Sequence, residues 1–229
     1  MLGVWVNCAV VVLGGLLGSF MKKAIPDRYA RTINHGLALC VLVIGIGGAL
    51  ETQNMLIMIA SVVLGTAAGT ALKIEDRLNC LGDFAQRKLS KGDSRFAEGF
   101  VNATLLFGVG AMAVVGSLEA GLSNKPDTLL AKAALDGVGA LIFASTFGPG
   151  VILSAIPLTL YQGGIALLAG TIAPFLTEEL IREMSAVGSV LIIGLGLNML
   201  GVMKDRICVG NMLPAMLVPV IYYSLAALL

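Results

Sequence analysis

The chain has 229 residues, a formal net charge of +1 and 13% charged residues, against 57% hydrophobic residues and a mean hydropathy of +0.93. Soluble domains carry about 25% charged residues, so this composition excludes a soluble globular protein and indicates an integral membrane protein. The near-zero net charge also argues against nucleic acid as a partner.

Apolar segments long enough to cross a bilayer as helices recur along the whole chain. They predict an all-α fold, a polytopic membrane helix bundle of about eight transmembrane helices in a single integral membrane domain, 1–229. No basic stretch precedes the first apolar run, so it is expected to be a span and not a cleaved signal. The expected spans are 3–21, 33–50, 55–72, 99–118, 129–147, 151–173, 186–203 and 208–228.

Basic residues gather in alternate loops of this predicted bundle. The loops after spans one, three and seven are rich in Lys and Arg, whereas the other loops hold only Lys125 and Arg182. Because cytoplasmic loops carry the excess of basic residues, both termini are expected outside the cytoplasm.

One charged segment, 73–98, separates spans three and four. Its apolar residues, including Ile74, Leu78 and Leu81, recur at helical spacing with charges on the other face. We expect a cytoplasmic amphipathic linker helix on the membrane surface. Its role is either that of a solvated linker or that of a regulatory, partner-binding segment.

The chain also contains a candidate internal repeat. A shift of 149 positions aligns residues 25–50 with the segment that begins at Pro174 and places Gly45 on Gly194, although the third spans align poorly. Spans 1–3 would then match spans 6–8 around a central helix pair. Because five crossings separate span one from span six, the halves would form an inverted repeat, as in many secondary transporters.

Spans five and six contain ionisable and polar residues, which mark a functional site by default at membrane depth. Lys132 and Asp136 lie one turn apart, and Asp136 is expected about 10 Å from the outer surface. Tyr161 and Gln162 lie at comparable depth, so an acid, an amide and a hydroxyl could converge on a cation or a small solute. The alternative is a structural clamp in which Lys132 neutralises Asp136, unless Lys132 extends to the outer surface.

Helix breakers surround these residues. Pro149 lies in a Gly-Pro-Gly turn, and Pro157 cannot donate a hydrogen bond to the carbonyl of Leu153, which predicts a kink in span six. Gly163 and Gly164 are expected to extend this break. Carbonyl groups freed in this way can bind ions where they line a cavity.

Other polar residues give weaker signals. Ser154 beside the turn and Asn102 in span four are further candidate ligands, with backbone or interhelical hydrogen bonding as the alternative. Enzyme signatures such as HExxH, GxSxG and Walker A are missing, and His35 is the sole histidine. We therefore expect neither an enzyme nor a cofactor. Small-residue faces, such as that of Gly14 and Gly18, predict close helix packing and are compatible with a homo-oligomer, for instance a dimer.

Resemblance to a known family is carried by three segments, SRFAEGFVNATLLFGVGAMAVVGSLEAGL (94–122), LLAKAALDGVGALIFASTFGPGV (129–151) and SAIPLTLYQGGIALLA (154–169). They are similar to the prokaryotic YqgA/YdfK-type membrane family, which is mainly described as a domain of unknown function. The resemblance implies a bacterial inner (plasma) membrane protein with a suggested role as a sodium channel or pump, and it supplies no catalytic residues. The family pattern has a serine at Ala133 and an acid at Ala120, so this chain lacks that hydroxyl and that carboxylate.

These observations predict a membrane transport protein, either a channel or a secondary transporter, for a small cation or small polar solute. Its site would lie near the midplane on spans five and six, with the lipid bilayer and the solute as its partners. The alternative function is a non-transporting membrane scaffold or sensor that acts through residues 73–98.

Overall fold

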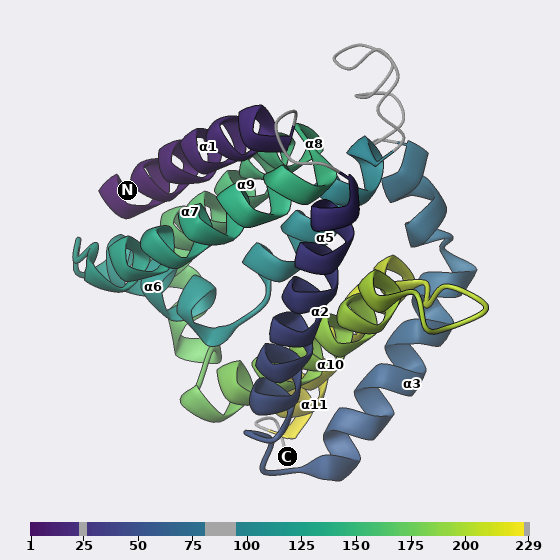
Figure 1. The fold of residues 1–229 in the computed structure, drawn as a ribbon. Helices are drawn as coiled ribbons and strands as arrows, with labels where there is room; N and C mark the ends of the chain where they lie inside the picture. Colours follow the sequence, from purple (N-terminus) through teal and green to yellow (C-terminus); the bar gives the residue numbers. More distant parts are fainter. Residues whose placement is uncertain (23–26, 81–94, 227–229) are drawn as a thin grey trace. The chain divides into compact units, whose positions relative to one another are not determined.

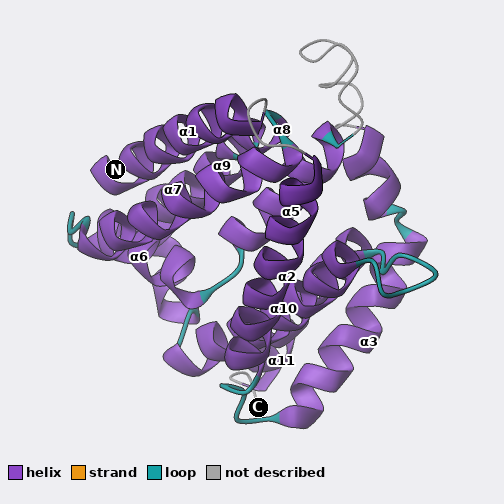
Figure 2. Ribbon diagram, in the orientation of Figure 1, coloured by secondary structure: helices purple, strands orange, loops and turns teal. Residues whose placement is uncertain are grey.

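The computed structural model describes residues 1–22, 27–80 and 95–226, and this part of the chain is helical without any strand (Figures 1 and 2). The chain divides into two compact units, each assembled from separate stretches of sequence. Unit 1 comprises Met1–Ile33, Leu78–Gly108 and Met112–Ala173, and unit 2 comprises Asn34–Arg77, Val109–Ala111 and Pro174–Leu229.

Unit 1 is organised around two long helices whose small residues allow close approach. The face of α1 that carries Gly14 and Gly18 packs along α7, where a Cβ on either glycine would overlap the carbonyl oxygens of Gly137 and Leu141. Contacts at rising positions in both helices show that α1 and α7 are parallel. The elements of unit 1 are α1 (Leu2–Lys22), α5 (Phe96–Gly108), α6 (Ala111–Leu122, from Met112 onward), α7 (Asp127–Phe147), α8 (Gly150–Leu153) and α9 (Ala155–Ile172). The short η1 (Ala173–Phe175) begins at the last residue of unit 1 and continues into unit 2.

Span four differs from its prediction as one straight helix over 99–118. It consists of α5 and α6, which meet at a 65° bend. Gly110 lies in the bend with φ 119°, a backbone conformation that a side chain with Cβ disfavours. The hydropathy of the sequence hides this bend because apolar residues continue across it.

Two interruptions of the helices lie before or near the start of span six, and none lies at the predicted Gly163 and Gly164. Gly148 ends α7 with φ 88°, and Pro149 precedes α8, as the Gly-Pro-Gly turn predicts. A second interruption lies at Ser154, where the missing N–H of Pro157 leaves no partner in the helix for the Leu153 carbonyl. The prediction of a break at Gly163 and Gly164 is wrong, because α9 continues through both residues.

Unit 2 contains the remaining long helices. A Cβ on Gly65 or Gly69 of α3 would overlap the backbone of Ala215 or Asn211 in η2, so these elements pack closely and in antiparallel directions. The elements are α2 (Asp27–Ala49), which belongs to unit 2 from Asn34 onward, α3 (Met55–Ala71), α10 (Glu178–Leu200), η2 (Val209–Leu217) and α11 (Val218–Ala226).

The α2 and α10 helices contact each other reciprocally. A Cβ on Gly45 would lie 2.8 Å from the backbone nitrogen of Ile193, and a Cβ on Gly196 would lie 2.8 Å from Leu42 Cγ. The residue numbers fall along α10 as they rise along α2, so the two helices are antiparallel. Any antiparallel pair gives such reciprocal contacts, and the inverted repeat stays a prediction.

Within each unit, the helix ends that meet are those that the predicted topology places on the same side of the membrane. In unit 1, Lys22 Nζ at the end of α1 donates to the Phe147 carbonyl at the end of α7, at 3.2 Å. The starts of both helices also meet, since a Cβ on Gly3 would lie 2.7 Å from Leu129 Cβ.

In unit 2, the helix ends that meet also agree with the predicted topology. Asn34 Nδ2 near the start of α2 donates to the Met199 carbonyl near the end of α10, at 3.0 Å. At the opposite end, the Glu183 carboxylate accepts from Thr52 Oγ1 at 2.5 Å and from the Gln53 backbone N–H at 2.7 Å. The loops after α2 and before α10 therefore lie at one end, as the predicted topology requires.

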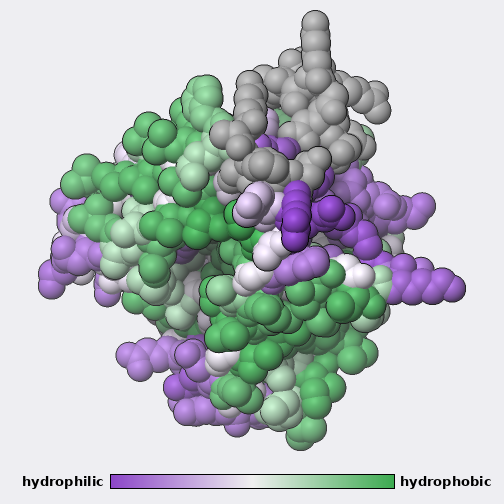
Figure 3. Space-filling view, in the orientation of Figure 1, coloured by the Kyte–Doolittle hydropathy of each residue, from purple (hydrophilic) through white to green (hydrophobic). Residues whose placement is uncertain are grey.

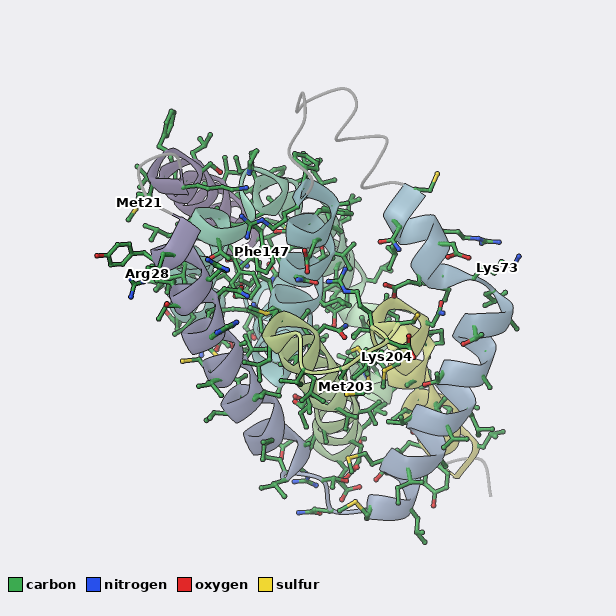
Figure 4. The ribbon with its side chains drawn as sticks, turned by 45° about the vertical axis from the view of Figure 1, so that its right-hand side comes forward. Met21, Arg28, Lys73, Phe147, Met203 and Lys204 are labelled. Carbon is green, nitrogen blue, oxygen red and sulfur yellow. The ribbon has the colours of Figure 1, made fainter. Side chains whose placement is uncertain are left out.

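The expected linker helix over 73–98 is only partly described. A helix covers Ile74–Cys80 and bends by 58° from α3, with Lys73 in the left-handed region at φ 52° and directed outward (Figure 4). Residues 96–98 belong to α5, and residues 81–94 lie outside the described part of the chain.

The helices are those of a polytopic membrane bundle. Among the described residues, five helices are long and apolar enough to cross a membrane, or up to seven if each of two bent pairs forms one span. The C-terminal helix, Val209–Leu225, is shorter, so the number eight stays a prediction. Hydrophobic side chains cover much of the face shown in Figure 3, which fits a surface in contact with lipid.

Candidate functional site

The α7 helix places a buried ion pair inside unit 1. Lys132 and Asp136 are separated by four residues, which puts their side chains on one face. Lys132 Nζ lies 2.7 Å from Oδ1 and 2.6 Å from Oδ2 of Asp136, and each residue is 6% exposed. Lys132 therefore pairs with Asp136 instead of extending to the surface.

Asn7 connects this pair to a third helix. Its Nδ2 donates to Asp136 Oδ2 at 3.0 Å and to Gln162 Oε1 at 3.1 Å, so α1 bridges α7 and α9. Asn7 and Gln162 are both 0% exposed. We call Asn7, Lys132, Asp136 and Gln162 the polar cluster.

The carboxylate fixes the orientation of both amides. An ionised Asp136 accepts hydrogen bonds only, so Asn7 must turn its NH₂ group toward it, and Gln162 must then turn Oε1 toward Asn7. Asn7 Oδ1 and Gln162 Nε2 are consequently buried without a partner among the described residues. The cluster thus contains one unused acceptor and one unused donor.

An apolar layer lies one turn from the polar cluster, toward the start of α1 and α7. Val4 lies one turn before Asn7, and Leu129 lies one turn before Lys132. Ala166 lies one turn after Gln162. These three residues pack with Ala120 of α6. All of them are 6% exposed or less. This layer separates the polar cluster from the end of unit 1 that the topology assigns to the outside.

The arrangement is electrostatically neutral and offers a single carboxylate. Ammonium and carboxylate balance each other, and the two amides carry no charge. No group of three or more His, Cys, Asp or Glu side chains that could hold a metal ion occurs among the described residues. The polar cluster thus lacks the charge that a divalent cation would require.

The other expected ligands are not part of these hydrogen bonds. Ser154 Oγ donates to the Val151 carbonyl at 2.7 Å, so it serves the interruption between α8 and α9. Asn102 is buried on α5, and its Nδ2 lacks a partner among the described residues. Tyr161 is half-buried and adjacent to Gln162, a spacing at which side chains on a helix face different directions.

Asn7 did not emerge from the sequence as a site residue. The available signal was its position on the face of α1 that carries the small residues. Asn7, Gly14 and Gly18 recur at spacings of seven and four, and all three are buried. A polar residue within a stripe of small residues therefore indicates a buried polar site better than depth in the membrane alone.

Comparison with known proteins gives a consistent relationship over the full length. The chain is 32% identical over 223 residues to the uncharacterized membrane protein YdfK of Bacillus subtilis (strain 168), which covers 96% of this chain and 94% of YdfK. It is 31% identical over 222 residues to the uncharacterized protein YqgA of Escherichia coli (strain K12), covering 94% and 93% respectively. No solved structure matches the chain. Residues 2–224 match the family described as Protein of unknown function (DUF554), and the chain belongs to this family of membrane proteins.

Proposed function

We propose that the protein transports a small cation or a small polar solute, with the polar cluster as its site. The observation that carries the proposal is a buried carboxylate that accepts from Lys132 and Asn7 and is connected through Asn7 to Gln162 of a third helix, with one oxygen and one nitrogen of these amides left unpaired.

Stability alone does not account for this cluster. Each unpaired buried polar atom costs about 1–3 kcal/mol, and buried ion pairs are often no more stabilising than apolar residues of similar volume. A clamp between helices would be better served by amides that satisfy each other fully. Unused hydrogen-bonding capacity at membrane depth is what a ligand site requires.

The surrounding backbone supports the same function. The chain interrupts its helices at Gly148 and Ser154, between the two elements that supply Asp136 and Gln162. Interrupted helices are typical of transporter sites, because they let one segment move relative to another. The apolar layer of Val4, Ala120, Leu129 and Ala166 would act as the outer barrier.

We further propose that the protein lies in a bacterial inner membrane with both termini outside the cytoplasm. The bias of basic residues toward alternate loops supports this orientation. The alternating ends of α1 and α7, and of α2 and α10, agree with the loop assignment within each unit.

The proposal is tested by Asp136→Asn in protein reconstituted into liposomes, with flux of monovalent cations as the readout. We expect flux to fall to the level of protein-free liposomes, because the substitution removes the only charged ligand of the cluster and keeps its shape. Asp127→Asn, which removes an exposed carboxylate from the first turn of the same helix, is the matched control and should retain flux.

A second variant separates loss of function from loss of fold. Replacing both charges, as in Lys132→Met with Asp136→Leu, leaves no unpaired buried charge and should preserve a monodisperse, folded protein. Its flux should be absent. Unchanged flux and selectivity in this double variant would remove the polar cluster from the transport pathway.

A further inference from the structure

We infer that Lys132 is a tethered competitor, whose ammonium occupies the position on Asp136 that a free monovalent cation takes during the transport cycle. This inference rests on the proposed function and concerns how the same site is regulated.

The first step is the position of the ammonium. Lys132 Nζ lies at nearly equal distances, 2.7 and 2.6 Å, from the two oxygens of Asp136. It thus takes the bidentate position at which a carboxylate binds a hard cation. A free cation cannot bind Asp136 there until the ammonium leaves.

The second step is the ligand set that remains without the ammonium. Both carboxylate oxygens of Asp136 then lose the ammonium, while Asn7 Nδ2 lies 3.0 Å from Asp136 Oδ2 and 3.1 Å from Gln162 Oε1. Asn7 Oδ1 is already buried without a partner, and a half-turn of its carboxamide would direct it toward Asp136. A bidentate carboxylate with amide oxygens close by and one negative charge suits a monovalent cation of alkali-metal type, because hard cations take oxygen ligands and this one needs a single balancing charge.

The third step is a destination for the ammonium. Lys132 lies about 7.5 Å along α7 from Asp127, the first residue of this helix. Lysine side chains near helix ends can extend their ammonium to the membrane surface while the stem stays in apolar surroundings. The side chain is therefore long enough to alternate between Asp136 and the end of α7 when the apolar layer of Val4, Ala120, Leu129 and Ala166 opens during the transport cycle.

The competition predicts that removal of Lys132 strengthens cation binding. The apparent affinity of a site is lowered by the fraction of time that its competent state is unavailable, so the loss of a competitor raises it. We expect the half-saturating cation concentration to fall roughly tenfold or more in Lys132→Met, within the usual range of coupling between sites. Binding is measured as the rise in melting temperature of purified protein in detergent during titration with lithium, sodium, potassium, rubidium or caesium chloride.

The controls separate specific binding from a general salt effect. N-methylglucamine chloride supplies the same ionic strength with a cation too large for the site. Lys125→Met removes an exposed ammonium just before α7 and should behave as wild type. Lys132→Met combined with Asp136→Asn should show only the N-methylglucamine response. Lys132→Gln keeps a neutral donor beside Asp136 and serves if Lys132→Met fails to fold.

The outcomes distinguish the competition from the proposed function. A cation-specific gain in Lys132→Met or Lys132→Gln that disappears without Asp136 supports the competition. Equal shifts with alkali cations and with N-methylglucamine in both Lys132 variants overturn it. If wild type still transports cations while those variants gain nothing, the tethered competitor is wrong and the transport proposal stands.

Discussion

At the scale of single residues, Asn7 determines how the polar cluster is connected. Its NH₂ group alone links the α7 carboxylate to the α9 amide, with both hydrogen bonds buried. An apolar residue at this position would leave Gln162 with neither amide atom paired. The cluster would keep its ion pair but would lose the connection between helices.

Asn7→Leu, which nearly preserves side-chain volume, should therefore lower the free energy of unfolding by about 1–3 kcal/mol. Thermal or denaturant unfolding in detergent measures this change. The neighbouring Cys8→Ala, at a half-buried position, is the control and should cost less. Equal stability of Asn7→Leu and wild type would show that the two hydrogen bonds contribute nothing.

At the scale of elements, glycines in long helices fall into two classes. Gly14 lies against the backbone of α7 and has no room for a Cβ, whereas Gly164 in α9 has no atom within 4 Å of a Cβ position. The first class determines helix packing, and the second only lowers the helix propensity of α9.

Gly14→Ala should thus destabilise the protein by roughly 1–3 kcal/mol through overpacking. Gly164→Ala should be neutral or stabilising by up to about 1 kcal/mol, since the helix gains propensity without a clash. Melting temperatures of the two variants check the contrast. A large loss of flux in a stable Gly164→Ala protein would instead indicate that α9 unwinds there during transport.

The sequence predicted helix ends where hydropathy falls at a polar loop, and it missed a helix end inside a continuous apolar segment. Each of the eight predicted spans overlaps a helix, because polar loops mark their ends. The bend at Gly110 was missed, since apolar residues continue through it. The convergence of Asp136 and Gln162 followed from depth, whereas their connection through Asn7 depended on which helices are neighbours, which depth does not reveal.

At the scale of the whole molecule, three pairs of elements pack in antiparallel directions at similar spacing in sequence. Asn7 meets Gln162 in unit 1, while Gly45 meets Ile193 and Gly65 meets Ala215 in unit 2. Span one thus contacts span six, span two contacts span seven, and span three contacts span eight. This order of contacts is what an inverted repeat of spans 1–3 and 6–8 would produce, but antiparallel packing alone does not establish it, so the repeat stays a prediction.

The topology predicts that the connections before α7 and after α10 lie on opposite sides of the membrane. In a cysteine-free background, Lys125→Cys should react with an impermeant maleimide in right-side-out vesicles. Lys204→Cys should react only after permeabilisation, because three spans separate the two positions. Reaction of both positions from the same side would contradict the span count between them.

Lys132 and Asp136 belong to one helix, so their ion pair forms without any other helix. The insertion of α7 into the membrane therefore does not depend on the later packing of its neighbours. Each charge alone would add ~2.5 to 3.5 kcal/mol to the cost of membrane insertion at a helix centre. Their spacing lets them neutralise each other once α7 becomes helical, so this segment can enter the bilayer before α9 has been synthesised. Asn7 gains its two hydrogen-bond partners only when both later helices arrive. Membrane insertion therefore gives the four-residue spacing a role that is independent of any bound solute.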